Sequence, residues 1–225
     1  MKPRSKKLLV ANWKANKSLR EARSWLESFQ TQDLKDVYEY VVCPPFTHLS
    51  ALTAAFPSVS FGAQDISAYE AGPYTGEVPG HVLQDFGLQY AIVGHSERRK
   101  YQHETSELVA KKVESALGAG LTPILCVDVG EFEKQLDFLD ASIVERVVFA
   151  YEPVHAISSF GGHEDPLETT LEHIEKLREL AGKHVHILYG GSVDTENSLM
   201  YLQEEAIDGV LVGKASLNPG TFASL

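Results

Sequence analysis

Four polar residues each follow a short apolar run of the sequence, at the point where a strand would end: Asn12, Lys14, His95 and Glu152. A carboxylate can act as a general base, a neutral imidazole as an electrophile, and an ammonium can offset developing negative charge. His95 opens a segment with helical character, and the positive end of a helix disfavours the cationic form of a histidine there. Together these side chains predict a proton-transfer site. Taken singly, each also fits an ordinary strand-terminating or solvated position.

Two glycine-containing segments follow the last two apolar runs, Gly190-Gly191-Ser192 and Gly213-Lys214-Ala215-Ser216. Glycine lets backbone N–H groups approach an anion closely, and a following helix adds its positive N-terminal end. The loops after the seventh and eighth strands are a common phosphate position in eight-stranded α/β barrels. One such segment alone is most simply a tight turn. Two in succession predict a phosphate site.

The elements that must position these residues begin with eight short apolar runs, which we expect to be strands. Most are continuously apolar rather than alternating, which is typical of strands buried on both faces of a parallel sheet. The runs are 8–11, 40–43, 59–62, 90–93, 123–127, 147–151, 185–189 and 209–212.

Helical patterns lie between most of these runs. The clearest is Leu167–Ala181, where apolar residues step by three or four. Asp165 is its expected N-cap and Pro166 its first helical residue. Further helices are predicted over 18–29 and 106–119.

A repeated strand–helix unit gives either a closed (β/α)8 barrel or an open, doubly wound parallel sheet. The open form usually carries a G-x-G-x-x-G turn, which this sequence lacks. Eight units therefore favour the barrel, and we expect one domain over 1–225.

Composition narrows the classes of function. The 225 residues carry a formal net charge of −11, which argues against binding nucleic acid or an anionic membrane through bulk charge. Only two cysteines occur, and no apolar run is long enough for a signal peptide or membrane helix, so we expect a cytoplasmic protein. His184 and His186 have the spacing of metal ligands on one strand face, but without further ligands we expect surface histidines and no metal.

Eight stretches, in order along the chain, resemble the triosephosphate isomerase family. They are 12–14 (NWK), 63–65 (AQD), 74–77 (YTGE), 93–99 (VGHSERR), 123–126 (PILC), 151–154 (YEPV), 188–192 (LYGGS) and 208–213 (DGVLVG). The resemblance implies a TIM barrel and a cofactor-free aldose–ketose isomerase that interconverts dihydroxyacetone phosphate and glyceraldehyde 3-phosphate in glycolysis and gluconeogenesis.

The resemblance also implies a role for each site residue. Glu152 would shuttle a proton between C1 and C2, while neutral His95 and Asn12 polarise the carbonyl and stabilise the enediolate. Lys14 would offset negative charge, and Glu97 would hold Lys14 and tune the catalytic site.

For the phosphate, the resemblance implies Ser192 and the backbone amides of Gly191, Gly213 and Lys214, with Asn12 and Lys14 also lining the substrate. Ser158 stands where the family has a glycine with a phosphate-facing amide. The family is usually dimeric through a loop after the third strand. The stretch Gln64–Gly80 matches that loop at full length and predicts a homodimer.

Three departures from the family pattern stand out. Residues 153–162 read PVHAISSFGG instead of the usual PVWAIGTG lid, which predicts altered lid kinetics with retained chemistry. Lys214 replaces a glycine, and its ammonium is expected either in solvent or near the phosphate. Only 20 residues separate Cys126 from Val147, which predicts a shortened fifth βα unit with about one helix over 131–146.

Two alternatives stay open from the sequence alone. A barrel of the same ancestry with this altered lid would act on another small phosphorylated substrate or catalyse slowly and leakily. A non-catalytic protein that binds a phosphorylated metabolite is the other. The combination of Asn12, Lys14, His95 and Glu152 argues against it, because binding alone needs no base.

Overall fold

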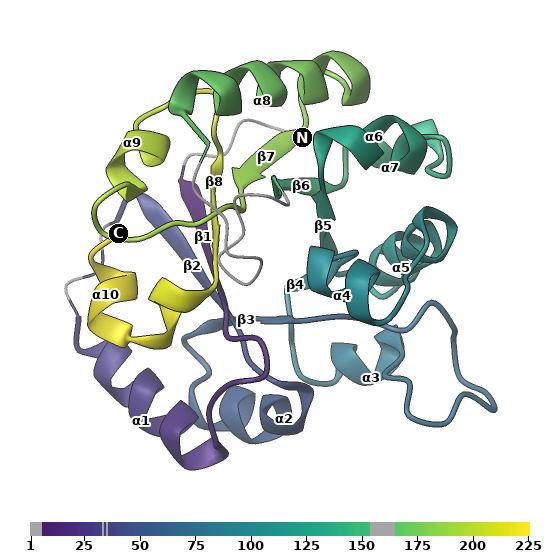
Figure 1. Cartoon of the computed structure of the whole chain (residues 1–225). Coiled ribbons are helices and arrows are strands. Elements are labelled where there is room, and N and C mark those ends of the chain that lie inside the picture. The colour runs from purple at the N-terminus through teal and green to yellow at the C-terminus, as the bar shows by residue number, and fades with distance from the viewer. Residues whose placement is uncertain (1–5, 33, 35, 154–164) are drawn as a thin grey trace.

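The computed structural model describes residues 6–32, 34, 36–153 and 165–225, and its centre is a closed barrel of eight strands (Figure 1). Each strand pairs in parallel with its neighbours in chain order, and β8 closes the ring against β1. The strands are β1 Lys7–Asn12, β2 Tyr38–Cys43, β3 Ser60–Ala63, β4 Tyr90–Val93, β5 Thr122–Val127, β6 Val148–Tyr151, β7 His186–Tyr189 and β8 Gly209–Val212. The eight predicted strands are confirmed, with ends shifted by no more than two residues.

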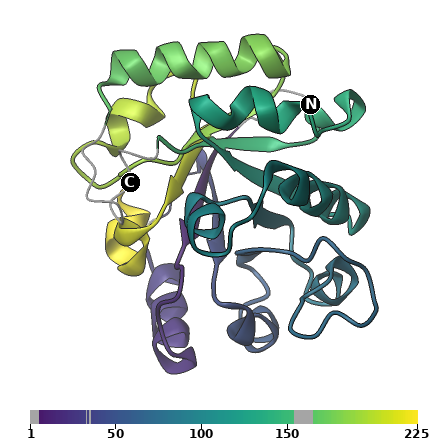
Figure 2. The ribbon, with the colours of Figure 1, turned by 45° about the vertical axis from the view of Figure 1, so that its right-hand side comes forward.

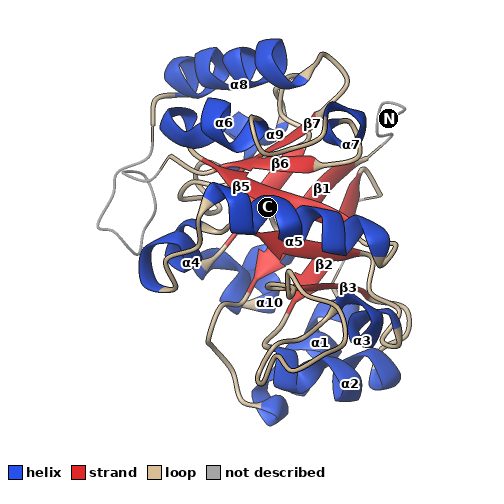
Figure 3. Ribbon diagram, turned by 90° about the vertical axis from the view of Figure 1, so that its right-hand side faces the viewer, coloured by secondary structure: helices blue, strands red, loops and turns tan. Residues whose placement is uncertain are grey.

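Side chains alternate along these strands between two separate apolar cores. Leu8 and Val10 point into the barrel with residues of the other strands, whereas Leu9 and Ala11 point outward to the helices. Both sets are fully buried, which explains why the strands read as continuous apolar runs. Figure 3 shows the strands enclosed by the surrounding helices. Because the interior is filled, a ligand can reach the barrel only at its ends.

The helices lie around the outside of the barrel (Figure 2). They are α1 Leu19–Gln30, α2 Phe46–Ala55, α3 Gly80–Gln84, α4 Ser96–Tyr101, α5 Ser106–Gly118, α6 Val129–Leu136, α7 Ala141–Val144, α8 Leu167–Ala181, α9 Ser198–Leu202, the 3-10 turn η3 Lys214–Leu217, and α10 Pro219–Ala223. The described helices include none with the length and apolar character to cross a membrane.

The predicted helix 167–181 is confirmed, but its start differs from the prediction. Pro166 is the N-cap and makes no side-chain capping bond. Asp165 turns inward instead, is only 6% exposed, and accepts a hydrogen bond from the Tyr151 hydroxyl at 3.3 Å. Its carboxylate therefore ties the start of α8 to the end of β6.

The segment between β5 and β6 also differs, because it holds two helices instead of one over 131–146. Asp128 caps α6 by accepting from the Gly130 amide, and Asp140 caps α7 by accepting from the Ser142 amide. The second aspartate cap starts a new helix where the first has ended.

The prediction of two surface histidines holds for one of them. His184 is exposed, whereas His186 is buried, with Nδ1 3.4 Å from Oδ1 of Asp208. The sequence pattern placed both on one strand face, but β7 begins only at His186.

Candidate active site

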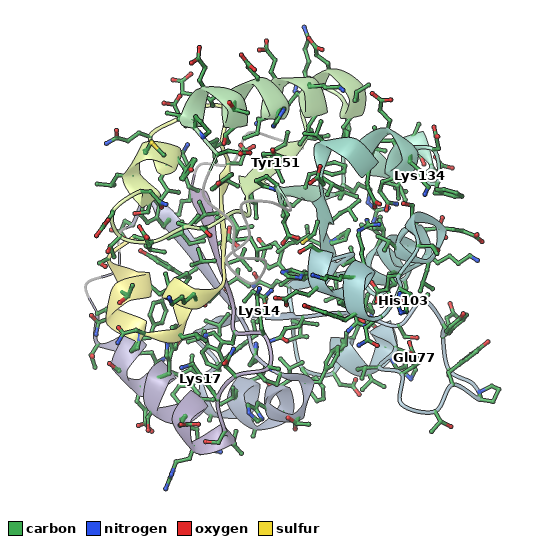
Figure 4. All side chains as sticks on the ribbon, in the orientation of Figure 1. Lys14, Lys17, Glu77, His103, Lys134 and Tyr151 are labelled. Carbon is green, nitrogen blue, oxygen red and sulfur yellow. The ribbon has the colours of Figure 1, made fainter. Side chains whose placement is uncertain are left out.

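A cavity of about 310 Å³ lies at the carboxyl ends of the strands, where the predicted chemistry was placed. Its lining comes from the ends of β1, β4, β6, β7 and β8, so residues far apart in sequence meet there. The predicted site residues that line it are Asn12, Lys14, His95, Glu97, Glu152, Gly191, Ser192, Gly213 and Lys214. Ser158 lies outside the described residues. Figure 4 places Lys14 near the middle of the molecule in this view.

Glu152 follows β6 directly and is held from both of its carboxylate oxygens. The residue is 2% exposed. Oε2 accepts a hydrogen bond from the Ser96 amide at 3.1 Å, and Oε1 lies 3.2 Å from Nε2 of His95. A Cβ on Gly190 would come within 2.9 Å of Glu152 Cγ, so position 190 must be glycine for the Glu152 side chain to lie where it does.

The turn after β4 fixes the protonation of His95. Gly94 has φ +65°, which favours glycine and lets His95 serve as the N-cap of α4. The Glu97 amide donates to Nδ1 of His95 at 3.1 Å. Because a backbone N–H can only donate, Nδ1 must be an unprotonated acceptor. The hydrogen-bond pattern thus assigns a neutral imidazole whose proton is on Nε2, facing Glu152.

Lys14 occupies a strained backbone position that several contacts maintain. Its φ is +51°, which a residue other than glycine seldom adopts. The Lys14 amide donates to Asn12 Oδ1 at 3.0 Å, and Nε2 of Gln64 donates to the Lys14 carbonyl at 2.9 Å. The Lys14 ammonium donates to Glu97 Oε1 at 2.6 Å. These contacts hold the ammonium at the cavity wall.

The two glycine segments form the other side of the cavity, and both come close to bulky neighbours. A Cβ at Gly191 would lie 2.3 Å from the Tyr189 hydroxyl oxygen, so only glycine fits at that position. A Cβ at Gly213 would lie 3.4 Å from Lys14 Cε. The loops after β7 and β8 therefore meet the base, the imidazole and the ammonium around one cavity.

Comparison with known proteins agrees with this arrangement. A profile of the family described as triosephosphate isomerase matches residues 7–225. Proteins named triosephosphate isomerase are 38% identical in Solibacter usitatus, with 98% of each chain covered, and 39% identical in Alkalilimnicola ehrlichii, with 98% of this chain and 97% of that one covered. A third, from Gloeothece citriformis, is 40% identical with 98% of each chain covered.

The chain belongs to the triosephosphate isomerase family. It is therefore an enzyme, an isomerase, and not a non-catalytic binding protein. The alignment with the Solibacter relative spans 244 positions, more than the 225 residues of this chain, so that relative carries residues that this member of the family lacks.

Four residues next to this site were given no role in it by the sequence. The Ser96 amide binds Glu152, and Gln64 holds the backbone of Lys14. Arg99 Nε donates to the Gly94 carbonyl at 2.9 Å, at the turn that places His95. Burial raises the pKa of the Cys126 thiol, and the nearby Glu152 raises it further. The stretches of family resemblance contain all four residues, but a motif does not say which atoms meet.

Proposed function

We propose that the chain interconverts dihydroxyacetone phosphate and D-glyceraldehyde 3-phosphate through an enediolate, with Glu152 as the base. The observation that carries this proposal is the pair of Glu152 Oε1 and His95 Nε2, 3.2 Å apart in a cavity whose other side carries two glycine loops. A base beside a neutral hydrogen-bond donor suits proton abstraction next to a carbonyl.

The proton and charge changes follow from the positions of the side chains. Glu152 removes a proton from one substrate carbon and returns it to the neighbouring carbon, while the hydroxyl proton passes from its oxygen to the former carbonyl oxygen, so no net proton is consumed. The Nε2–H of His95 and the side-chain amide of Asn12 donate to the oxygens that become negative in the enediolate. Lys14, held by Glu97, offsets that negative charge.

Glu152 must change partners before it can react. Its Oε2 accepts from the Ser96 amide, and an oxygen engaged in that bond is less able to take a proton from carbon. Substrate entry therefore has to draw the carboxylate from Ser96 toward the reacting carbons.

We propose that the substrate phosphate binds to the loops after β7 and β8, through Ser192 and the amides of Gly191, Gly213 and Lys214. Both glycines line the cavity, and at Gly191 a Cβ would strike the Tyr189 hydroxyl oxygen, so the position stays glycine and no side chain covers its amide. For Ser158 the proposal rests on the family resemblance alone.

A coupled assay with glyceraldehyde 3-phosphate tests the function. We expect turnover by the wild-type protein and a fall of about 10²–10⁴-fold in kcat for Glu152→Ala, the usual contribution of a general base. Absence of turnover in a folded protein that still binds phosphoglycolate would contradict the proposal. Methylglyoxal release in place of isomer would instead favour the leaky alternative.

We further propose a homodimer formed through the loop Gln64–Gly80, which projects from the body of the molecule next to α3 (Figure 1). Tyr69 and Tyr74 stack on each other in this loop with ring centroids 4.3 Å apart, yet they are 43% and 42% exposed. An exposed, self-packed aromatic pair is typical of a surface that binds a partner protein.

Light scattering at micromolar concentration tests the dimer. We expect twice the mass of the chain for wild type and a smaller mass for Tyr74→Asp, because a charge would be buried at the interface. The exposed position Tyr101→Asp on α4 reports whether the effect is confined to the loop. A monomeric wild-type protein would rule the proposal out.

Finally, we propose that the chain is one barrel domain over 1–225 that serves glycolysis and gluconeogenesis in the cytoplasm. A single unfolding transition seen by two probes tests whether the chain is one domain.

Rescue of a strain that lacks its own triosephosphate isomerase tests the role in glycolysis and gluconeogenesis. Imaging of a tagged copy in its native host tests the cytoplasmic location.

A further inference from the structure

The charged side chains that line the cavity differ in how many partners they have within the protein. Two carboxylates and two ammonium groups are found among the described lining residues, from Glu97, Glu152, Lys14 and Lys214. Glu97 pairs with the Lys14 ammonium at 2.6 Å, and Glu152 is bound by the Ser96 amide and faces His95. With His95 neutral, these formal charges cancel, so the lining as a whole offers no excess of positive charge to an anion.

Lys214 differs from Lys14 in its partners. It follows Gly213 at the start of η3, its side chain is exposed, and it makes no hydrogen bond or ion pair with any other described residue. Both lysines line the same cavity from different strands, and Lys14 Cε passes 3.4 Å from the Cβ position of Gly213, the residue before Lys214. An ammonium on a flexible four-carbon stem at this place can turn toward a ligand without breaking a bond inside the protein.

We propose that the Lys214 ammonium binds the substrate's phosphate dianion directly and raises the site's preference for doubly charged phosphate over uncharged analogues. This inference rests on the proposed function, since it assigns one more contact to the same phosphate site. It goes beyond the amide of Lys214, which any residue at this position would supply.

The protein's overall charge makes this contact matter. The chain has a formal charge of −11, so its general field repels a dianion. Lys14 shares its charge with Glu97 and is only partly available to the phosphate. Lys214 is therefore the charged lining side chain, within the described part of the chain, that can compensate a phosphate without giving up a partner.

The kinetic signature follows from the place of the phosphate in the reaction. The phosphate does not change its bonds, so a contact made equally in the bound substrate and in the transition state acts as uniform binding, and its loss raises KM. Where binding of the phosphate also helps to draw Glu152 toward the reacting carbons, loss of the contact lowers kcat as well, so kcat/KM is the quantity that must fall.

The test compares Lys214→Gln, which keeps a polar side chain without charge, with Lys214→Arg, which keeps the charge. Lys183→Gln is the matched control, because Lys183 is exposed just before β7, at the opposite end of the barrel, and its loss changes the net charge equally. Three readouts apply: the dissociation constant of inorganic phosphate by calorimetry, KM and kcat for glyceraldehyde 3-phosphate, and the slow turnover of glyceraldehyde without phosphate.

For Lys214→Gln we expect the dissociation constant of phosphate and the KM to rise by about three- to tenfold. This change in affinity lies between the values typical of an exposed ion pair and of a charged hydrogen bond. The effect should shrink at high salt. Turnover of unphosphorylated glyceraldehyde should change far less than kcat/KM for the phosphorylated substrate, and Lys214→Arg should keep most of the affinity.

Three results would overturn the inference. They are equal effects of Lys214→Gln and Lys183→Gln, an equal loss on the unphosphorylated substrate, and no binding of phosphate by wild type. If wild type binds phosphate but does not isomerise the triose, the proposed reaction fails, while the calorimetric comparison still decides whether Lys214 holds the anion.

Discussion

Two ionic clusters meet at α4, where the neighbouring residues Glu97 and Arg98 belong to different clusters. The site cluster contains Glu97 with Lys14, His95 and Glu152, and it lines the cavity. The buried cluster contains Arg98 with Asp65, Glu104 and Lys112. Both combine carboxylates with cationic or imidazole groups, so the types of residue do not distinguish them.

The number of partners distinguishes them. The Lys112 ammonium uses all three of its donors, with 2.7 Å to each Asp65 oxygen and 2.5 Å to Glu104 Oε1. Burial raises the pKa of the Asp65 carboxyl, and Lys112 offsets part of that rise. By contrast, the Lys14 ammonium donates to one described residue, Glu97. An ammonium whose three donors are all engaged, as in Lys112, can only hold the fold, whereas an ammonium with donors left over, as in Lys14, can bind a ligand.

The largest effect should come from Lys112→Met in the buried cluster. Removing the ammonium leaves Asp65 and Glu104 close together with only Arg98 between them, and breaking a buried ion pair from one side costs about 3–5 kcal/mol. We expect that loss in the free energy of unfolding from urea titration, with kcat per folded molecule near wild type. The adjacent, exposed Lys111→Met removes only a surface ion pair with Glu107 and should cost far less stability than Lys112→Met. If Lys112→Met mainly lowered kcat, the division between the clusters would be wrong.

His95→Gln in the site cluster should show the reverse pattern. Glutamine keeps a donor but not the ring that Gly94 and the Glu97 amide hold in place. Loss of one placed donor to a developing oxyanion costs about 10²–10³-fold in kcat. Steady-state kinetics and thermal melts of the same samples check this, and a large fall in the melting temperature would count against it.

A sharper test replaces the neighbours Glu97 and Arg98 by glutamine in two separate variants. Glu97→Gln removes a charged hydrogen bond to Lys14, worth about 1.5–3 kcal/mol, so kcat/KM should fall by about ten- to a hundredfold. Arg98→Gln should lower unfolding stability instead, and by less than Lys112→Met, because Lys112 still binds both carboxylates. Similar profiles for the two variants would remove the distinction between the clusters.

The smallest effect concerns Cys126, which lies buried next to Glu152. Burial raises the pKa of its thiol, so the reactive thiolate is rarer than in a free cysteine at the same pH. We expect no labelling of Cys126 by iodoacetamide at pH about 8 in the native protein, and labelling in urea, as read by mass spectrometry. Fast native labelling would mean that solvent reaches the base from inside the barrel.

The sequence by itself determined the order of elements and the chemistry at the strand ends. The eight strands could be predicted because most are buried on both faces and therefore continuously apolar, and Asn12, His95 and Glu152 each lie at or just after the end of one of them. The helix Leu167–Ala181 could be predicted to the residue because its apolar residues follow one face. These are local properties, which the spacing of residue types records.

The tertiary structure alone decided which polar groups meet. Asp165 has the sequence position of a helix cap, but its carboxylate instead accepts a hydrogen bond from Tyr151 of β6. Two aspartate caps, Asp128 and Asp140, split the segment after β5 into two helices. Glu97 and Arg98 are adjacent, yet one faces the cavity and the other pairs with two carboxylates that a buried lysine also binds. Such choices depend on side chains from distant segments, because only closure of the barrel brings β1, β4, β6, β7 and β8 to one cavity.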